Sequence, residues 1–296
     1  MRNVLSLFDG ISCGRLSLDR AGVKYGRYYA SEIEKRALKV TQHNYPDTIQ
    51  LGDVTKVTAD MVDGDVFLLM GGSPCQDLSA YKYDRGDVKG LEGSKSNLFY
   101  HFERLFRETK PKYFLFENVP MRKEWEEIIS ELLGVEPIII NSNLVSAADR
   151  KRLYWTNIPG ITQPKDKQIY IRDIIVDAKD VPDKYWYDKP FTYHGEYAKV
   201  QCTLDIKGHR HMKEVYNING KCSTLTTCDG GNLQKKVYQD GRCRKFMPIE
   251  YERLMNIPDN YTNVVCDTDR YSTIGNGWTV DVIAHILSFL PLEYFL

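Results

Sequence analysis

The sequence has no apolar run near the roughly 18 residues that a membrane-spanning helix requires. It also has no Cys-x-x-Cys pair, and its seven cysteines are odd in number, which argues against a disulfide framework and against a structural zinc site. The first residues, Met-Arg-Asn-Val-Leu-Ser, lack the pattern of a signal peptide. We therefore expect a globular protein of the reducing cytoplasm whose cysteines remain thiols.

An excess of charge of either sign is also missing. The chain has 40 Lys and Arg and 40 Asp and Glu, so its net charge is zero, which speaks against a nucleic-acid partner. The distribution differs from the total: in residues 199–245 ten basic residues stand against four acidic ones, 10 − 4 = +6, and the remainder carries −6. Such a basic segment fits phosphate binding, and it fits a solvated charged surface equally well.

Internal repeats and low-complexity tracts are absent, and up to about residue 160 strand-like and helix-like segments alternate. Strands are predicted over 4–8, 28–31, 48–51, 66–70, 113–116 and 137–141, and helices over 14–21, 34–44, 97–108, 124–133, 248–255 and 279–290. This alternation predicts an α/β, doubly wound, mostly parallel Rossmann-like sheet. Between 163 and 246 the chain turns to short Tyr-, Asp- and Lys-rich pieces without a helical face. We therefore predict one domain from 1–162 and 247–296 and a smaller strand-and-loop domain over 163–246.

A cysteine stands where the fourth predicted strand ends. The run Val-Phe-Leu-Leu-Met is followed by Gly71-Gly72-Ser73-Pro74-Cys75, in which the glycines allow a close-packed exit and Pro74 holds Ser73 extended. Open α/β sheets bind their ligands at the carboxyl ends of strands. Cys75 is then either a nucleophile on a rigid turn or a small buried apolar side chain, which is the commoner fate of such a residue. The long Gly- and Lys-rich stretch after it, 80–95, is typical of a mobile lid.

An acid and two arginines lie in two later segments that are also predicted to be extended. A second apolar strand ends at Glu117, which shares the edge of Cys75 if the two strands are neighbours. The segment 146–155, Ser-Ala-Ala-Asp-Arg-Lys-Arg-Leu-Tyr-Trp, places Arg150 and Arg152 at alternate positions, which share a face on an extended chain.

Acids and glycines at the first three strand ends indicate a nucleotide-like ligand. Gly10 and Gly14 follow the first strand but do not match the dinucleotide pattern Gly-x-Gly-x-x-Gly, which weakens a pyrophosphate site. Glu32 ends the second strand, where an acid can accept both ribose hydroxyls, and Asp53 ends the third, where it can accept from an adenine amine. Each acid could also cap the helix that follows it.

Taken together, the stretches Ser-Leu-Phe-Asp-Gly (6–10), Gly-Gly-Ser-Pro-Cys (71–75) and Val-Ser-Ala-Ala-Asp-Arg (145–150) resemble motifs of the DNA (cytosine-5) methyltransferases. The wording is nearest to the catalytic domain of the eukaryotic de novo enzymes, and the resemblance runs from Val4 to the carboxyl terminus. It implies S-adenosylmethionine as the cofactor and flipping of the target base from double-stranded DNA. It also makes the small domain a target-recognition domain.

The resemblance assigns residues to three roles. Catalysis falls to Cys75 as nucleophile, Glu117 as acid at ring nitrogen 3, and Arg150 and Arg152 as holders of the base carbonyl and of charge. Asn118 is expected to place Pro74 or the loop. Cofactor binding falls to Phe8, Asp9, Gly10, Gly14, Glu32, Ile33, Asp53, Val54, Ser73, Pro74, Asn276 and Trp278. DNA binding is predicted for Gln76, Ser79, His211, Thr224, Lys235, Lys236 and Arg242, with His211 filling the gap left by the flipped base.

Other interpretations stay open at this point. A tRNA cytosine-5 methyltransferase shares the fold and the Pro-Cys-Gln motif, although its Cys-Phe-Thr tripeptide is missing here. A catalytically inactive regulatory relative would have lost motifs that this chain keeps. His209 and His211 with Cys222 or Cys228 could form a metal set, but their spacing fits no common zinc pattern. We expect no metal, no membrane, a monomer on DNA, and a bacterial or phage-borne enzyme of restriction-modification type in the cytoplasm.

Overall fold

The structure is a computed structural model that describes residues 2–74, 90–93, 96–228 and 232–296. The chain divides into two compact units. The first comprises Met1–Ile140, Lys151–Gln163 and Ile283–Leu296, and the second comprises Asn141–Arg150 and Pro164–Val282. Each unit is described by itself.

The first unit is built on a seven-stranded sheet of order β3-β2-β1-β4-β5-β8-β6. Its strands are β1 Asn3–Leu7, β2 Tyr28–Ser31, β3 Ile49–Gln50, β4 Val66–Gly71, β5 Tyr113–Asn118, β6 Ile138–Asn141 and β8 Lys151–Thr156. Its helices are α1 Cys13–Ala21, α2 Lys35–Asn44, α3 Phe99–Thr109 and α4 Lys123–Leu133. The neighbours from β3 to β5 are parallel, and β8 runs antiparallel to β5. The predicted Rossmann-like sheet is confirmed.

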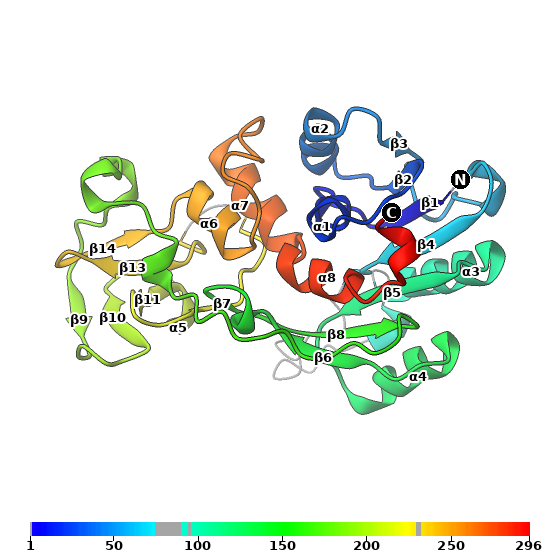
Figure 1. Cartoon of the computed structure of the whole chain (residues 1–296). Helices are drawn as coiled ribbons and strands as arrows, with labels where there is room; N and C mark the ends of the chain where they lie inside the picture. The colour runs from blue at the N-terminus through cyan, green and yellow to red at the C-terminus, as the bar shows by residue number, and fades with distance from the viewer. Residues whose placement is uncertain (1, 75–89, 94–95, 229–231) are drawn as a thin grey trace. The chain divides into compact units, whose positions relative to one another are not determined.

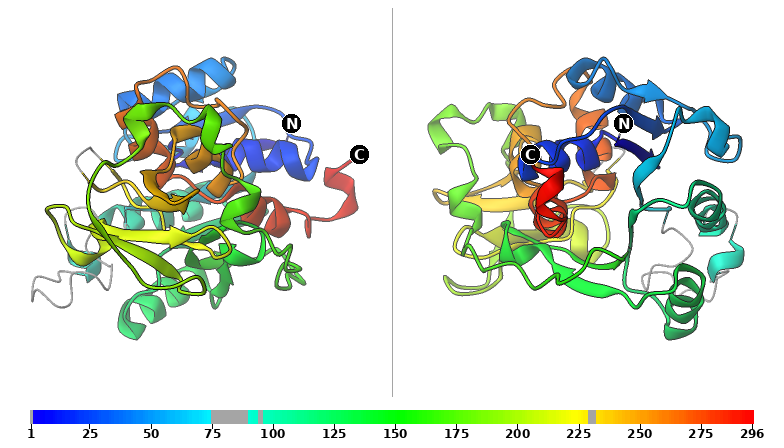
Figure 2. Two further views of the ribbon diagram at one scale, coloured as in Figure 1. Left: turned by 90° about the vertical axis from the view of Figure 1, so that its left-hand side faces the viewer. Right: turned by 45° about the vertical axis from the view of Figure 1, so that its right-hand side comes forward.

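The strands form where the sequence has short apolar runs, and all five residues of β1 and all six of β4 are buried. Helices α3 and α4 cover one face of this sheet, because Phe102 and Leu105 of α3 and Ile129 of α4 pack with Leu69 and Phe116 in one core (Figure 1). The carboxyl-terminal segment returns to the amino-terminal strands, where the rings of Phe67 and Tyr294 stack at 5.2 Å, and Figure 2 shows both chain ends in this region.

The order of the strands reverses between β1 and β4, which is the point where open α/β sheets bind ligands. The register pairs Leu7 with Gly71, so the two strands end together. A Cβ at Gly71 would lie 2.9 Å from the ring of Phe102 and 3.1 Å from the carbonyl oxygen of Leu7. This confirms the close-packed exit that the glycines predict.

The second unit contains a five-stranded sheet of order β14-β13-β11-β10-β9 and a small pair, β12 with β7. Its strands are β7 Ala148–Asp149, β9 Phe191–Tyr193, β10 Val200–Leu204, β11 Glu214–Asn217, β12 Cys222–Ser223, β13 Lys236–Gln239 and β14 Arg242–Lys245. Its helices are α5 Arg210–Lys213, α6 Pro248–Leu254 and α7 Asp267–Asn276, and α8 Val280–Leu287 leads into the first unit.

One short segment of the chain, residues 186–193, contacts both edges of the larger sheet of the second unit. Trp186 bridges to Arg244 of β14, and the amide of Tyr187 donates to the carbonyl of Cys243 at 2.9 Å. Only a few residues later the chain forms β9 at the opposite edge. Cys202 of β10 and Cys243 of β14 consequently pack in one small core, although two strands separate them within the sheet. The segment 186–193 thus runs from one edge of this sheet to the other.

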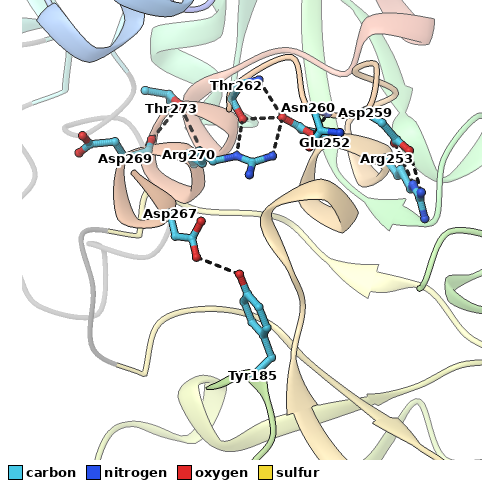
Figure 3. Close-up of polar contacts among 10 residues, drawn as sticks. All are labelled: Tyr185, Glu252, Arg253, Asp259, Asn260, Thr262, Asp267, Asp269, Arg270 and Thr273. Atoms are coloured by element: carbon cyan, nitrogen blue, oxygen red, sulfur yellow. Dashed lines mark hydrogen bonds and ion pairs between the residues drawn. The ribbon is translucent and has the colours of Figure 1, made fainter. Parts of the chain in front are cut away.

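Helices α6 and α7 are joined by an ion pair between Glu252 and Arg270 (Figure 3). Glu252 is fully buried, and its carboxylate accepts from the main-chain N–H groups of Asn260 and Thr262 and from Arg270 at 3.1 Å. Glu250, also fully buried, accepts both ends of the Arg244 guanidinium at 2.6 and 2.7 Å. Full pairing of this kind offsets the cost of burying charge.

Some boundaries differ from the prediction. The helix of α5 was not expected between 163 and 248, and β3 is only two residues long. Residues 247–282 group with the second unit and not with the first. The division into a catalytic and a target-recognition domain stays a prediction. No helix in the described residues has the length and apolar character to span a membrane.

Candidate active site

Glu117 and Arg152 form an ion pair at the end of β5. The guanidinium Nε lies 2.9 Å from Oε1 of the carboxylate, and the two side chains are only 11% and 10% exposed. The antiparallel register pairs Glu117 with Tyr154, so Arg152 stands diagonally across from the carboxylate on the same face of the sheet. The acid predicted from the sequence is thus held at a strand end by one of the two predicted arginines.

Asn118 fixes the exit from the neighbouring strand β4. Its Nδ2 donates to the carbonyl and to the hydroxyl oxygen of Ser73, at 3.4 and 3.2 Å, and the Ser96 hydroxyl donates to the carbonyl of Pro74 at 3.4 Å. Because β4 and β5 are parallel neighbours, the chain leaves β4 beside the strand that carries Glu117. Three predicted residues of this loop lie outside the described part of the chain: Cys75, Gln76 and Ser79.

The turn after β1 is strained and is supported from within. Phe8, Gly10 and Ser12 all have left-handed φ angles, of 58, 57 and 58°, which cost energy for residues other than glycine. The buried carboxylate of Asp9 accepts from the hydroxyls of Ser12 and of Tyr28, the latter at 2.7 Å. Burial raises the pKa of Asp9, and these hydroxyl bonds oppose the rise. The Asp9 side chain supports the turn, which leaves only its main chain for the predicted cofactor contact.

Glu32 binds the same turn through its carboxylate. Oε2 accepts from the amide of Gly10 at 2.8 Å, and Oε1 accepts from the amides of Ile33 and Glu34 at 2.7 Å each. A carboxylate has about four acceptor positions, so three are used and one remains on Oε2. One acceptor position is thus left for a ribose hydroxyl, and the prediction that Glu32 binds the ribose stays a prediction.

The surroundings of Glu32 fit a nucleoside. The Ile33 side chain is 69% exposed, and the space where Gly10 would carry a Cβ is open within 4 Å. Asp53 accepts from the amide and the hydroxyl of Thr55, at 3.0 and 2.9 Å, and these bonds lower its pKa. Val54 is 6% exposed and packs in the core. Apolar surface for a ring beside acceptors for hydroxyl and amine groups is what an adenosine requires.

The sequence matches the C-5 cytosine-specific DNA methylase family over residues 2–290. The chain belongs to this family. The type II methyltransferase M.HhaI of Haemophilus parahaemolyticus is 26% identical over 308 residues, which cover 95% of this chain and 92% of the relative. The type II methyltransferase M1.ScrFI of Lactococcus lactis subsp. cremoris is 28% identical over 331 residues, covering 98% and 78%. The predicted activity, DNA (cytosine-5) methyltransferase, is confirmed at the level of the family.

The same fold occurs in a solved structure. The methyltransferase EhMeth of Entamoeba histolytica superimposes with a TM-score of 0.74 at 17% identity, over 98% of this chain and 97% of that chain. At this identity the likeness concerns the fold alone. The family implies a methyl donor, and the arrangement around Glu32 and Ile33 fits the adenosine part of S-adenosylmethionine.

Arg150 of the methyltransferase has partners that the sequence did not predict. Its guanidinium is buried in the second unit, where Nη1 donates to the carbonyls of Leu225 and Gly275 at 3.0 and 3.5 Å and Nη2 donates to that of Gly277 at 3.1 Å. Arg150 lies between β7 and β8 and belongs to neither strand. The prediction that Arg150 and Arg152 share one face of a single extended segment therefore does not apply to Arg150.

The predicted DNA-binding cations separate into exposed and buried ones. Lys236 is 1% exposed, its ammonium donates to the carbonyls of Asn232 and Gln234 at 2.8 Å each, and burial lowers its pKa to about 8. The prediction that Lys236 contacts DNA is corrected for this reason. Lys235, the residue before β13, is half-buried, and the exposed Arg242 stacks over Trp186 with its guanidinium carbon 4.6 Å from the ring centre.

The remaining predicted residues of the second unit lie at or near the surface. The exposed His211 stands 3.4 Å from Glu214, and the Thr224 hydroxyl donates to the carbonyl of Asp149 at 2.8 Å. Asn276 is exposed and Trp278 is half-buried. Within the described residues no group of three or more His, Cys, Asp or Glu could hold a metal ion, so the alternative metal set does not come together.

Sequence reasoning missed the groups that support the cofactor turn. Tyr28 and Ser12 bond the buried Asp9, and the Thr41 hydroxyl lies 3.1 Å from that of Ser12. Tyr28 begins a strand that is parallel to β1 and pairs with Val4, near the amino end of β1, and its hydroxyl reaches Asp9 beyond the other end. No local pattern in the sequence indicates this contact.

Proposed function

We propose that the chain transfers a methyl group from S-adenosylmethionine to carbon 5 of a cytosine in double-stranded DNA, with Cys75 as nucleophile, Glu117 as acid and Arg152 as its partner. The observation that carries the proposal is the ion pair between Glu117 and Arg152, 2.9 Å long, at the end of β5. The neighbouring strand β4 leads within four residues to Cys75. The acid therefore ends the strand next to β4, whose sequence continues to the proposed nucleophile.

The chemistry follows from the weakness of cytosine carbon 5 as a nucleophile. The Cys75 thiolate adds to carbon 6 while Glu117 gives a proton to ring nitrogen 3, and the electron pair thus placed at carbon 5 attacks the methyl group. Loss of the carbon 5 proton then expels the thiolate, and return of the nitrogen 3 proton to Glu117 restores the neutral ring. Arg152 holds Glu117 in place and stabilises charge near the base carbonyl.

S-adenosylmethionine supplies an electrophilic methyl group on a sulfonium. We assign its ribose to Glu32, its adenine to Ile33, Val54 and Asp53, and its adenosine face to Phe8. Further contacts are proposed for the main chain of Asp9, Gly10 and Gly14, for Ser73 and Pro74, and for Asn276 and Trp278. The open space beside Gly10 and the exposed Ile33 support this assignment.

For the DNA, the cytosine has to leave the stack, which costs a few kcal/mol that other contacts must offset. We assign phosphate contact to Thr224, Lys235 and Arg242 and the vacated stack to His211, with Gln76 and Ser79 near the base. The enzyme would act as a monomer in the cytoplasm of a bacterial or phage-infected cell.

A covalent trap tests this function. A duplex with 5-fluorocytosine should capture the wild-type chain, because fluorine cannot leave as a proton does, and Cys75→Ser should form no adduct while it still binds cofactor. Cys266→Ser, which replaces an exposed thiol, is the matched control and should trap normally. Bisulfite sequencing of DNA from expressing cells locates the target. An adduct with Cys75→Ser, or transfer to tRNA and none to DNA, would overturn the proposal.

A further inference from the structure

Arg150 is a buried cation at the carboxyl end of helix α7. The last carbonyls of a helix have no partners within it, and positive charge near them is favourable. The Arg150 guanidinium meets this need by donating to Gly275 within the helix and to Gly277 just after it. Its third bond, at 3.0 Å, goes to Leu225, which is 50 residues away from Gly275 in sequence. One side chain thus ties two separate segments together.

The two segments also touch through their main chains. A Cβ at Gly275 would lie 2.7 Å from the carbonyl carbon of Thr226 and 3.0 Å from the amide nitrogen of Thr227, so glycine is required there. The Thr227 hydroxyl bonds to the side-chain oxygen of Asn276. Neither segment can shift alone without breaking these contacts.

Both segments are anchored at their other ends. Helix α7 is held by the bond of Arg270 to the buried Glu252, and the carboxylate of Asp267 at its start accepts from the Tyr185 hydroxyl at 2.8 Å (Figure 3). On the other segment, β12 pairs with β7, which places Thr224 on the carbonyl of Asp149, the residue before Arg150. Arg150 therefore sits at the junction of two fixed elements.

We propose that Arg150 is a positioning residue that couples DNA binding at the segment of Thr224 to cofactor binding at Asn276 and Trp278. The inference rests on the proposed function, which gives these two segments to different ligands. A ligand that fixes one segment fixes the other through the shared guanidinium, so each ligand tightens the binding of the other by the same factor. A flexible lysine would keep the charge but lose the planar fork that reaches both segments.

The test measures that factor. The dissociation constant of S-adenosylhomocysteine is determined by calorimetry with and without a duplex that the wild type methylates, and that of the duplex with and without S-adenosylhomocysteine. We expect each constant to fall at least about fivefold in the wild type, the lower end of ordinary coupling. In Arg150→Lys the factor should drop below about twofold while both ligands still bind singly. Arg253→Lys, which changes an arginine bonded to Asp259 in the same unit, should keep the full factor.

Each outcome decides the matter. The coupling is overturned if Arg150→Lys shows the same coupling factor as the wild type. It is also overturned if the wild type binds both ligands and neither changes the dissociation constant of the other. Both results leave the proposed function standing. A wild type that binds neither ligand overturns the proposed function itself. If Arg150→Lys does not fold, Arg150→Gln decides, because its single NH2 group cannot reach both segments as the guanidinium fork does. A reduced factor in that variant supports the inference, and an unchanged factor overturns it.

Discussion

Glu32→Gln tests the cofactor turn more sharply than removal of the side chain, because the carboxylate acts only as an acceptor. Its two oxygens accept three main-chain N–H groups, from Gly10 at 2.8 Å and from Ile33 and Glu34 at 2.7 Å. An amide has one acceptor oxygen, and its NH2 group donates. Whichever way the glutamine is turned, its NH2 group faces an N–H that needs an acceptor.

The magnitude follows from the better of the two orientations. With its oxygen toward Ile33 and Glu34, the glutamine leaves the N–H of Gly10 without a partner. A hydrogen bond to a charged group contributes about 1.5–3 kcal/mol, so we expect the free energy of unfolding to fall by about that amount. The remaining acceptor position for a ribose hydroxyl, on Oε2, is lost as well. If the lost bond to the ribose hydroxyl also contributes about 1.5–3 kcal/mol, the dissociation constant of the cofactor should rise about 10- to 140-fold, since about 1.4 kcal/mol corresponds to a factor of ten.

Two measurements separate these effects. Calorimetry with S-adenosylhomocysteine gives the dissociation constant, and urea unfolding gives the stability. Glu34→Gln is the matched control, since Glu34 is exposed and its side chain bonds Arg36, and it should leave both nearly unchanged. A Glu32→Gln variant with lowered stability and a dissociation constant within about threefold of the wild type, less than 1 kcal/mol, would refute the cofactor assignment.

Glu117→Gln should slow methyl transfer far more than it weakens DNA binding, because the acid is needed chiefly when charge develops at nitrogen 3; equal losses in single-turnover rate and in affinity would indicate a structural role. Neutralising Lys235 and Arg242 together should lower the salt slope of DNA binding by about 0.9 per phosphate contact, and an unchanged slope would remove both from the interface. Lys236→Met should remove a pH dependence of the free energy of unfolding. Burial lowers the pKa of Lys236 to about 8 from 10.5, so between these values the unfolded chain holds a proton that the folded chain does not. Wild-type stability should therefore rise relative to the variant by roughly 3 kcal/mol between pH 8 and 10.5 in urea unfolding, and a flat difference would contradict the burial.

The sheet of the first unit could be predicted because its strands are short apolar runs that end in glycines and acids. The strand predicted over 66–70 is β4, and Glu117 lies at the end of its parallel neighbour β5. Position along a strand and order in the sheet are enough to place these groups. Cys75 lies outside the described residues, so its role stays a prediction.

The partners of individual polar groups could not be predicted in the same way. Glu32 uses three main-chain N–H groups, one of them 22 residues away at Gly10. Arg150 bonds carbonyls 75 and 125 residues further along the chain, at Leu225 and Gly275. In the second unit Trp186 likewise bridges to Arg244. Such contacts depend on the tertiary fold and leave no local pattern in the sequence.

Not all of the basic side chains in residues 199–245 are available to bind phosphate. Strand β13 begins at Lys236, whose side chain is buried, so of the pair Lys235 and Lys236 only Lys235 can face a phosphate. Lys236 and Arg244 are buried, the latter in its bond to Glu250, so the excess of +6 in residues 199–245 leaves +6 − 2 = +4 for the surface. At about 0.9 units of salt slope per phosphate contact, this excess corresponds to a slope of about 3.6. A steeper measured slope would require phosphate contacts from cations in other parts of the chain.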